Sequence, residues 1–348
     1  MPETPPLRFG ICVGIPDIEG KSHYELFKEN IELIQYAEEM GLDEVWLTEH
    51  HASKHGLNSG VLTIIAALAR ETSRIRLGTS ISVLPFWNPV RLAEEVAIVD
   101  LLSEGRFEFG VGSGYRKHEF TGLGIDPSER VSRYMEALHV LDNVFDGKPF
   151  TFDGQHYKID SRGMRPLPYQ QPHPPMWATG LSEPGIRWAG ERGWGWMIAP
   201  GWIGELENMH PLRQMYYDAI KPTGVKPKIY LQMQALTARR STEDVRAEGE
   251  KWVRWWMDAV NIGETVFGGM MYDKITPEII QSWWDVGFHG SPDHVLKQVE
   301  HYAKWGVTDF GFQITFGPPL ERLKETVQVL AQDVAPVARK WGEMAPVG

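Results

Sequence analysis

The sequence contains a single cysteine, Cys12, among its 348 residues. One thiol can form neither a disulfide within the chain nor a cysteine-based zinc cage, so both are excluded. Long apolar runs are also absent, since no segment approaches the roughly 20 residues that a membrane-spanning helix needs. The first residues, Met-Pro-Glu-Thr-Pro-Pro, lack the basic start and the apolar centre of a signal peptide. We therefore expect a soluble cytoplasmic protein that does not contact a membrane.

Positive charge is scarce as well. The formal net charge is −11, and the Lys and Arg residues form no cluster of the kind that contacts a nucleic-acid backbone. Nucleic acid is therefore not an expected partner. The phosphate-binding loop and the nucleophile elbow are also missing. Glu49, His50, His51 and His55 lie close together but do not match the His-Glu-x-x-His spacing of zinc enzymes, so we predict no metal site.

What the chain does contain is a regular alternation of strand-like and helix-like segments. The predicted strands cover residues 8–15, 45–47, 75–83, 107–111, 176–179, 195–198, 228–236 and 309–314. Each is followed by a helical pattern without an internal linker, which predicts a single α/β domain over residues 1–348, a (β/α)8 TIM barrel. Insertions are expected at about 146–174, with a hairpin near Asp153-Gly154, and at about 261–290, as an irregular stretch. The alternative, an open doubly wound sheet, would need a glycine-rich turn after the first strand, and Ile15-Pro16-Asp17 is not one.

Three polar residues, Glu49, His50 and His51, follow the predicted strand at 45–47. Ligands bind at the carboxyl ends of the strands in such folds, so chemistry is expected here. A histidine can exchange protons near neutral pH, and a neighbouring carboxylate can orient its ring and raise its pKa. Glu49 and His50 are therefore the candidate catalytic residues, whereas His51 is expected to point the other way. The alternative that one histidine only caps the strand end stays open.

Two loops after predicted strands are candidates for ligand contact. The glycine-rich loop after residue 109 lacks the G-x-G-x-x-G spacing, because its third glycine would fall on Tyr115 or Lys117. Its glycines let the chain approach a flat ligand closely, or they simply permit a tight turn. In the second loop, Ser182 and the free N–H groups at the start of a helix can bind an anion, or Ser182 is a plain N-cap.

Five stretches of the chain carry a resemblance to a known family. The most specific are Gly41–His51, Asn88–Glu95 and Asp100–Phe107, the last of which leads into the glycine-rich loop. Gly290–Pro292, before a predicted helix, and Asp333–Pro336 add to them. In this order, and over nearly the whole chain, they resemble the bacterial luciferase-like family of flavin-dependent monooxygenases.

The resemblance implies that reduced FMN, supplied by a separate flavin reductase, reacts with O2 to a C4a-hydroperoxide that oxygenates a small, apolar organic substrate. His50 matches the family's catalytic histidine. Ser80-Ile81 falls where members place a non-proline cis peptide beneath the isoalloxazine ring, and Leu181 and Ser182 match the phosphate-binding loop. The full set of implied cofactor residues is Ser80, Ile81, Gly112, Ser113, Tyr115, Gly180, Leu181 and Ser182.

Two positions depart from the light-emitting members of the family. Ser113 stands where they have an arginine near the phosphate, so the phosphate contacts are expected to differ. Gly112 replaces a reactive cysteine that oxygen activation does not require. Two other functions remain open on the same barrel: hydride transfer with a deazaflavin, and flavin binding without catalysis. The family mostly forms dimers, so a homodimer is expected, although no interface stripe is evident in the sequence.

Fourteen tryptophans are many for this length, and they concentrate in the second half of the chain. The adjacent pairs Trp255-Trp256 and Trp283-Trp284 are not expected to face one core together from regular helices. We therefore predict that the insertion at 263–289 closes over the flavin and shields it from water, a requirement of flavin oxygenation. Ordinary core packing is the alternative for these rings.

Overall fold

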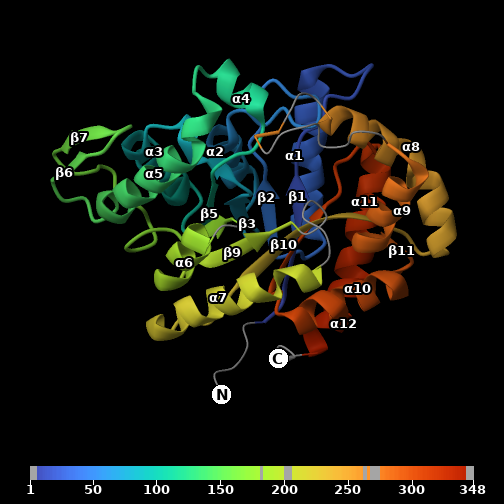
Figure 1. Cartoon of the computed structure of the whole chain (residues 1–348). Coiled ribbons are helices and arrows are strands. Elements are labelled where there is room, and N and C mark those ends of the chain that lie inside the picture. Colours follow the sequence, from blue (N-terminus) through green and yellow to red (C-terminus); the bar gives the residue numbers. More distant parts are fainter. Residues whose placement is uncertain (1–5, 181–182, 200–205, 262–264, 267–274, 342–348) are drawn as a thin grey trace.

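The computed structural model describes residues 6–180, 183–199, 206–261, 265–266 and 275–341. Its centre is a closed parallel barrel surrounded by helices (Figure 1). In their order around the barrel, the strands are β1 (Arg8–Val13), β2 (Glu44–Leu47), β3 (Arg76–Thr79), β5 (Phe107–Gly112), β8 (Met176–Thr179), β9 (Gly195–Ile198), β10 (Ile229–Thr237) and β12 (Asp309–Gln313). β12 pairs with β1 and closes the barrel. The predicted (β/α)8 fold is confirmed.

The helices that follow the barrel strands are α1 (His23–Glu39), α2 (Val61–Glu71), α3 (Pro89–Leu102), α5 (Arg130–Val144), α6 (Glu183–Glu191), α7 (His210–Ile220), α8 (Thr242–Val260) and α11 (Leu320–Val329). Three of the helices outside the barrel, α1, α3 and α8, begin at a side chain that accepts from their free N–H groups. Ser22 and Glu25 form a capping box at the start of α1. The side chain of Asn88 accepts two N–H groups at the start of α3, and Pro89 takes the first helical position. These boundaries are therefore set by local sequence.

The predicted third strand is divided in the structure. β3 ends at Thr79, and a short strand β4 (Ser82–Val83) follows after the Ser80–Ile81 peptide, which is cis. Both β3 and β4 pair with β5. The prediction of one continuous strand over 75–83 was wrong, because the chain turns at the cis peptide before it resumes pairing.

Both expected insertions contain regular structure. In the first, β6 (Phe150–Asp153) and β7 (Lys158–Ser161) form the predicted antiparallel hairpin, and the Glu136 carboxylate on α5 accepts the backbone N–H groups of residues 155–157. The second insertion was expected to be irregular, and this was wrong for its last part. α9 (Pro277–Val286) begins at the capping side chain of Thr276, and β11 (Phe288–Gly290) pairs with β10 before α10 (Pro292–Trp305).

The barrel interior is filled in layers. A cluster halfway up brings together side chains from five different strands, so these side chains must point inward: Cys12, Trp46, Trp177, Met197 and Tyr230. Glycines on neighbouring strands make room for the large rings. A Cβ at Gly78 would lie 2.3 Å from Trp46, and one at Gly195 would lie 2.1 Å from Trp177. The rings therefore seal the barrel below its carboxyl-terminal mouth.

Beneath this aromatic layer, buried charges gather at the amino ends of the strands. The guanidinium of Arg8 contacts Glu44, Glu108 and Asp309, and Arg76 contacts Glu108 as well. Burial raises the pKa of Glu44 to about 8; Arg8 opposes this shift, while Asp309 and Glu108 add to it. Burial would also raise the pKa of Glu108, but Arg8 and Arg76 hold it at about 2. Glu44 is therefore protonated at neutral pH.

We expect Glu44 to make the protein less stable as the pH rises. The unfolded chain loses the Glu44 proton near pH 4.5, whereas the folded protein keeps it up to about pH 8. Between these values the free energy of unfolding should fall by about 1.4 kcal/mol per pH unit from this group. Glu44→Gln should remove that slope in urea unfolding at pH 5.5 to 8, roughly spanning this window. Glu39→Gln, at an exposed site on α1, is the control. Equal slopes for the two variants would contradict the buried-proton account.

Candidate active site

The predicted site residues that the structure describes lie at one end of the barrel. Glu49 and His50 follow β2, the Ser80–Ile81 peptide joins β3 to β4, and Gly112 ends β5 ahead of Ser113 and Tyr115. Gly180 follows β8. Because the strands are parallel, all of these positions meet at the carboxyl-terminal mouth. Leu181 and Ser182 lie outside the described residues.

The Ser80–Ile81 peptide is cis, as the resemblance implied. Its neighbour Gly112 is in close contact with it: a Cβ at Gly112 would lie 2.3 Å from Ile81 Cδ1 and 2.5 Å from Thr179 Cγ2. The glycine is therefore required by the approach of β5 to the Ile81 and Thr179 side chains. By contrast, a Cβ at Gly180 would meet no atom of the described residues within 4 Å.

His50 is held by a carboxylate far away in the sequence. Its Nδ1 lies 3.0 Å from Glu119 Oε1, and the same oxygen accepts the backbone N–H of His51 at 3.0 Å. Glu119 lies on the short helix α4 (Lys117–Gly122) and is buried. Burial alone would raise the pKa of Glu119, but the charge and hydrogen bond of His50 lower it below its usual range. An ionised Glu119 makes Nδ1 the protonated nitrogen of His50.

The other ring nitrogen of His50 is available for chemistry. No residue in the described part of the chain makes a hydrogen bond to His50 Nε2. The ring of His55 lies 4.1 Å from that of His50, and burial keeps the pKa of His55 well below its ordinary value, so His55 is neutral.

Glu49 does not serve His50, which corrects the expectation from the sequence. Its carboxylate lies 3.1 Å from His51 Nε2 and accepts the backbone N–H of Val83 at 2.8 Å and the indole N–H of Trp87 at 3.1 Å. Burial would lower the pKa of His51, but its hydrogen bond to Glu49 raises it. Glu49 and His51 are two residues apart, so their side chains lie on the same side of the chain. Through Val83 and Trp87, Glu49 also connects the end of β2 to β4 and to the segment after it.

Glu119 was missed by sequence reasoning because no motif marks it. It lies 69 positions from His50, and the pairing exists only because the loop after β5 folds back over the end of β2. Only the structure shows that Glu119 is a buried carboxylate on the short helix α4, which marks it as a candidate functional residue.

The guanidinium of Arg130, on a different element, lies close to Ser113. Arg130 is the first residue of α5, and its Nη1 donates to the hydroxyl of Ser113 and to the carbonyl of Gly114. Its partial burial lowers the pKa of the guanidinium, although an arginine remains charged. The position after Gly112 lacks the arginine of the light-emitting subunit, and Arg130 supplies a positive charge at the same loop.

The second insertion reaches the mouth through Thr265 and Val266. Arg116 and Thr265 form an isolated antiparallel bridge, and Val266 N–H donates to the Tyr115 carbonyl at 2.9 Å. The Arg116 side chain is fully buried and donates to the carbonyl of Val260 at the end of α8. The insertion is therefore tied to the loop that carries Tyr115.

Comparison with known proteins places the chain in a family. The model of the luciferase-like monooxygenases matches residues 7–309. The chain belongs to that family. This luciferase-like monooxygenase is 25% identical over 347 residues to the oxygenase component of the flavin-dependent trigonelline monooxygenase of Acinetobacter baylyi, and the match covers 95% of each chain. Its relatives are flavin-dependent monooxygenases, which makes it an oxidoreductase of the monooxygenase type.

Solved structures of similar fold include proteins with different cofactors. Monooxygenase RslO1 from Streptomyces bottropensis has a TM-score of 0.84 at 24% identity, over 95% of this chain and 99% of its own. The oxygenating part of 3,6-diketocamphane monooxygenase from Pseudomonas putida, solved with FMN, has a TM-score of 0.75 at 18% identity, over 95% and 98%. An F420-dependent secondary alcohol dehydrogenase has a TM-score of 0.73 at 17% identity, over 96% and 99%. These likenesses show the fold.

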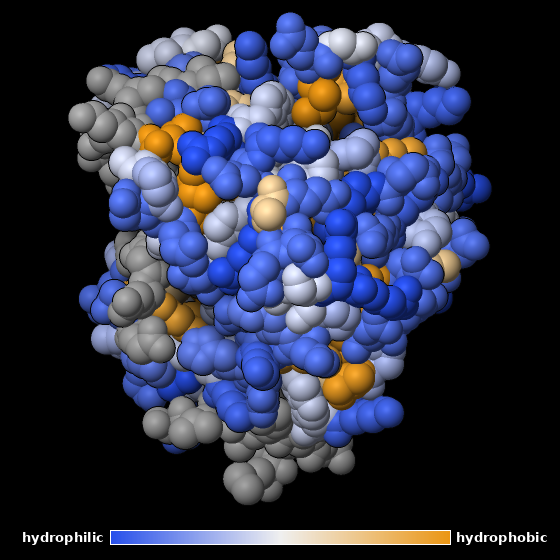
Figure 2. Space-filling view, turned by 90° about the vertical axis from the view of Figure 1, so that its right-hand side faces the viewer, coloured by the Kyte–Doolittle hydropathy of each residue, from blue (hydrophilic) through white to orange (hydrophobic). Residues whose placement is uncertain are grey.

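The tryptophan pair of the luciferase-like monooxygenase is core, contrary to the expectation that its rings would be divided. Trp283 and Trp284 on α9 are both buried in one cluster with Trp256 and Phe316. Both rings pack on the same side of α9: Trp283 stacks on His289 at 4.1 Å, and Trp284 meets the same ring edge-on at 4.9 Å. The surface on this side of the molecule is largely hydrophilic, with hydrophobic residues in small separate groups (Figure 2).

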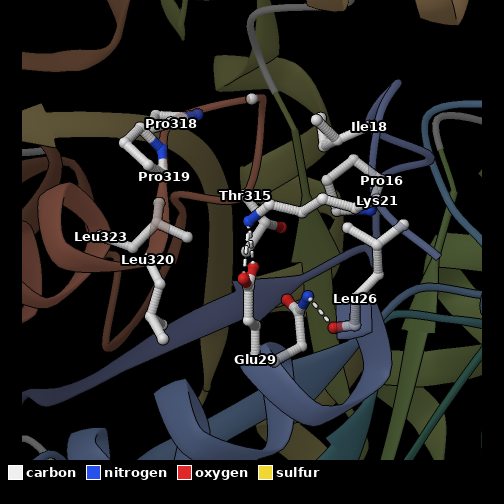
Figure 3. A pocket seen from close by; sticks show the side chains of 12 residues that line it. Pro16, Ile18, Lys21, Leu26, Glu29, Thr315, Pro318, Pro319, Leu320 and Leu323 are labelled. Atoms are coloured by element: carbon white, nitrogen blue, oxygen red, sulfur yellow. Dashed lines mark hydrogen bonds and ion pairs between the residues drawn. The ribbon is translucent and has the colours of Figure 1, made fainter. Parts of the chain in front are cut away.

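One small cavity of 110 Å³ lies between α1 and the loop from β12 to α11 (Figure 3). Its wall combines the Lys21–Glu29 ion pair, with 2.6 Å between nitrogen and oxygen, and apolar side chains that include Pro319 and Leu323. None of the predicted site residues lines it. Within the described residues, no group of His, Cys, Asp or Glu could hold a metal ion, and no helix is long and apolar enough to cross a membrane.

Proposed function

We propose that the protein is the oxygenase component of a two-component monooxygenase, which takes reduced FMN from a separate flavin reductase and uses O2 to oxygenate a small organic molecule. The proposal rests on three features that lie at the carboxyl-terminal mouth of the barrel. The cis Ser80–Ile81 peptide, the Arg130–Ser113 contact and the open Nε2 of His50 lie together at the ends of β2 to β5. The name of the relative from Acinetobacter baylyi, an oxygenase component, supports the same conclusion.

The residues at the mouth fit a flavin. Gly112 has no side chain, which leaves room for the side chain of Ile81 next to the cis peptide. Gly180, which follows β8, and the guanidinium of Arg130 suit a phosphate, which Leu181 and Ser182 would bind as well. Bound reduced FMN supplies the electrons and the site at which O2 is activated. The protein residues then have to position the substrate, exclude water and manage protons.

His50 manages the proton in this proposal. With Nδ1–H donated to Glu119, Nε2 can accept a proton at the mouth and give it back. The Glu119 carboxylate stabilises the imidazolium that forms and keeps the ring in one tautomer. Glu49 contributes indirectly, because its three hydrogen bonds fix His51 and Val83 on either side of the site.

Water exclusion depends on two features. From below, the rings of Trp46, Trp177 and Tyr230 close the barrel. From above, Val266 joins the backbone at Tyr115, so the second insertion extends over part of the mouth. A water-poor site protects the activated flavin from loss of peroxide. We also retain the assignment of residues 1–348 to one domain with insertions at about 146–174 and 261–290.

Hydride transfer with a deazaflavin is the second candidate, because an F420-dependent alcohol dehydrogenase shares the fold. The two functions differ in which reduced cofactor binds and in what O2 does next. Quenching of tryptophan fluorescence should report tighter binding of reduced FMN than of a reduced deazaflavin. In stopped flow, O2 should reoxidise protein-bound reduced FMN with a course distinct from that of free FMN. Binding of the deazaflavin alone would overturn the proposal.

Arg130 should contribute strongly to the affinity for FMN. Arg130→Met removes a partly buried positive charge at the expected phosphate site, which should weaken binding by about 1.5–3 kcal/mol, or roughly tenfold and more. Binding of riboflavin, which lacks the phosphate, should change little. Arg133→Met is the matched control, because Arg133 lies one turn later on α5 and pairs with Glu129. An equal loss for FMN and riboflavin would mean that Arg130 is structural.

We also propose a homodimer formed through the exposed face of α3. Ile98, Leu101 and Leu102 on this helix are 44%, 40% and 38% exposed, which leaves an apolar surface near its end. Arg91 and Glu95 form an ion pair on the same helix. A second copy related by twofold symmetry would bring both apolar and opposite-charge groups into contact.

Ile98→Asp should therefore convert the protein to a monomer in light scattering at micromolar concentration. The charge would be buried without a partner at the interface, at a cost of several kcal/mol, roughly enough to dissociate an ordinary dimer. Val225→Asp, at another exposed apolar residue, should leave the mass unchanged. A wild-type monomer, or a dimer that survives Ile98→Asp, would refute the assignment to α3.

A further inference from the structure

Three glutamines form a connected group on the neighbouring strands β10 and β12. Gln232 and Gln234 lie on β10, and Gln313 ends β12, directly beside Gln234 in the strand register. Gln234 and Gln313 are buried, with 4% and 5% of their surface exposed. The group also reaches the cis peptide, because Ser80 Oγ donates to Gln232 Oε1 at 2.8 Å.

The strand register places these side chains inside the barrel. Gln232 and Gln234 follow Tyr230 at alternate positions of β10, and Tyr230 belongs to the inward-facing aromatic layer. Gln313 pairs with Cys12 on its other side, a second member of that layer. The glutamines therefore lie one layer above the aromatic rings, in the half of the barrel that opens at the mouth.

The hydrogen bonds within the group leave one donor and one acceptor unused. Gln313 Oε1 accepts from Gln232 Nε2 and from Gln234 Nε2, both at 3.3 Å. In the described part of the chain, Gln313 Nε2 donates to no residue and Gln234 Oε1 accepts from none. Neither atom is among the fully buried polar atoms without a partner, so both keep some contact with solvent in the open half of the barrel. An amide donor and acceptor that remain accessible in this way can bind a ligand.

We propose that the glutamine group binds a planar, uncharged ligand edge in which a carbonyl lies beside an N–H, as in a lactam, an imide or a carboxamide. The carbonyl would accept from Gln313 Nε2, and the N–H would donate to Gln234 Oε1. The glutamines carry no charge that could compensate a buried ionic ligand. The inference rests on the proposed flavin site, because Ser80 connects the group to the cis peptide. If the substrate supplies this edge, it is not purely apolar, as was expected from the sequence. If the flavin supplies the edge, the group binds the cofactor instead.

Two molecules could present this edge. The pyrimidine ring of a flavin has an imide, in which N3–H is flanked by two carbonyls. A substrate with a lactam or carboxamide group offers the same arrangement. Methylation of flavin N3 removes the donor without altering the phosphate, which separates the two sources experimentally.

The test measures binding by tryptophan fluorescence without oxygen. The ligands are reduced FMN, reduced 3-methyl-FMN and, in the presence of FMN, nicotinamide as a carboxamide probe with benzoate as the charged comparison. They are titrated into the wild type, Gln313→Leu, Gln313→Glu and Gln214→Leu. Gln313→Glu keeps the oxygen that Gln232 and Gln234 use, replaces the spare N–H donors by an acceptor and adds a negative charge; Gln313→Leu removes the donors without adding a charge. Gln214→Leu, on the exposed face of α7, is the matched control.

If the flavin supplies the edge, the wild type should bind FMN about tenfold more tightly than 3-methyl-FMN, and both Gln313 variants should lose that preference. If the substrate supplies it, the two flavins should bind alike, while nicotinamide should bind the wild type more tightly than benzoate and lose about tenfold in the variants. Equal flavin affinities together with unchanged nicotinamide binding would overturn the inference. Failure of the wild type to bind either flavin would instead overturn the proposed function.

Discussion

His50→Ala should lower product formation by about 10²–10⁴-fold while reduced FMN still binds, because proton transfer by a positioned side chain typically contributes that much. The expectation rests on the 3.0 Å contact that fixes Nδ1 on Glu119 and leaves Nε2 open at the mouth. Turnover should be measured in single-turnover mixing with O2, so that reductase supply does not limit it. Glu119→Gln should lower turnover less, since the ring keeps a hydrogen-bond partner and loses only the charge.

His51→Ala is the control for that experiment. His51 pairs with Glu49, whose other hydrogen bonds go to Val83 and Trp87, so its loss should act mainly on stability. A larger loss of turnover from His51→Ala than from His50→Ala would mean that the roles are reversed. Unchanged turnover in both variants would mean that the proton carrier is a residue outside the end of β2.

Trp283→Ala should destabilise the protein by about 3–5 kcal/mol, the usual cost of removing a large aromatic ring from a core. The ring is 7% exposed and touches Trp256, Trp284, His289 and Phe316. Urea unfolding of the variant gives the change directly. Trp252→Ala, at a partly buried ring on the edge of the same cluster, should cost less.

The coupling of NADH oxidation to product distinguishes packing from shielding. Because Trp283 lies inside a core cluster, peroxide release per NADH should stay at the wild-type level at a temperature where the variant is folded. A rise in peroxide without loss of stability would restore the original expectation that this ring shields the flavin.

The barrel was predictable from sequence because its signals are local. The apolar run at β2, the glycine that precedes it and the caps at Ser22 and Asn88 are read from a few neighbouring residues. The position of the mouth followed from parallel strands alone. The cis peptide at Ser80–Ile81 came from family resemblance, since no physical rule predicts a cis bond before isoleucine.

The pairings within the mouth were not predictable, because they join distant segments. Glu49 was chosen as the partner of His50 because it is adjacent, yet the side chains of neighbouring residues diverge, and Glu119 arrives from another loop. The Gln234–Gln313 contact is a further case, because it joins strands that lie 79 residues apart in the sequence. Arg130 reaches Ser113 over a shorter span, from the start of α5 to the loop after β5. The tryptophan pair was misread for a related reason: His289, which follows the helix on β11, gives both rings one shared packing partner.

The aromatic layer of Trp46, Trp177 and Tyr230 divides the barrel into two compartments with different tolerance for change. Below it, the polar contacts of Arg8 and Arg76 join the five strands β1, β2, β3, β5 and β12, and an exchange there affects the whole fold. Above it, the glutamines and His50 make none of the Arg8 and Arg76 contacts, so their replacement leaves those contacts in place. Directed evolution could therefore vary the upper compartment by saturation mutagenesis, one position after another. The unchanged lower compartment would keep each variant folded.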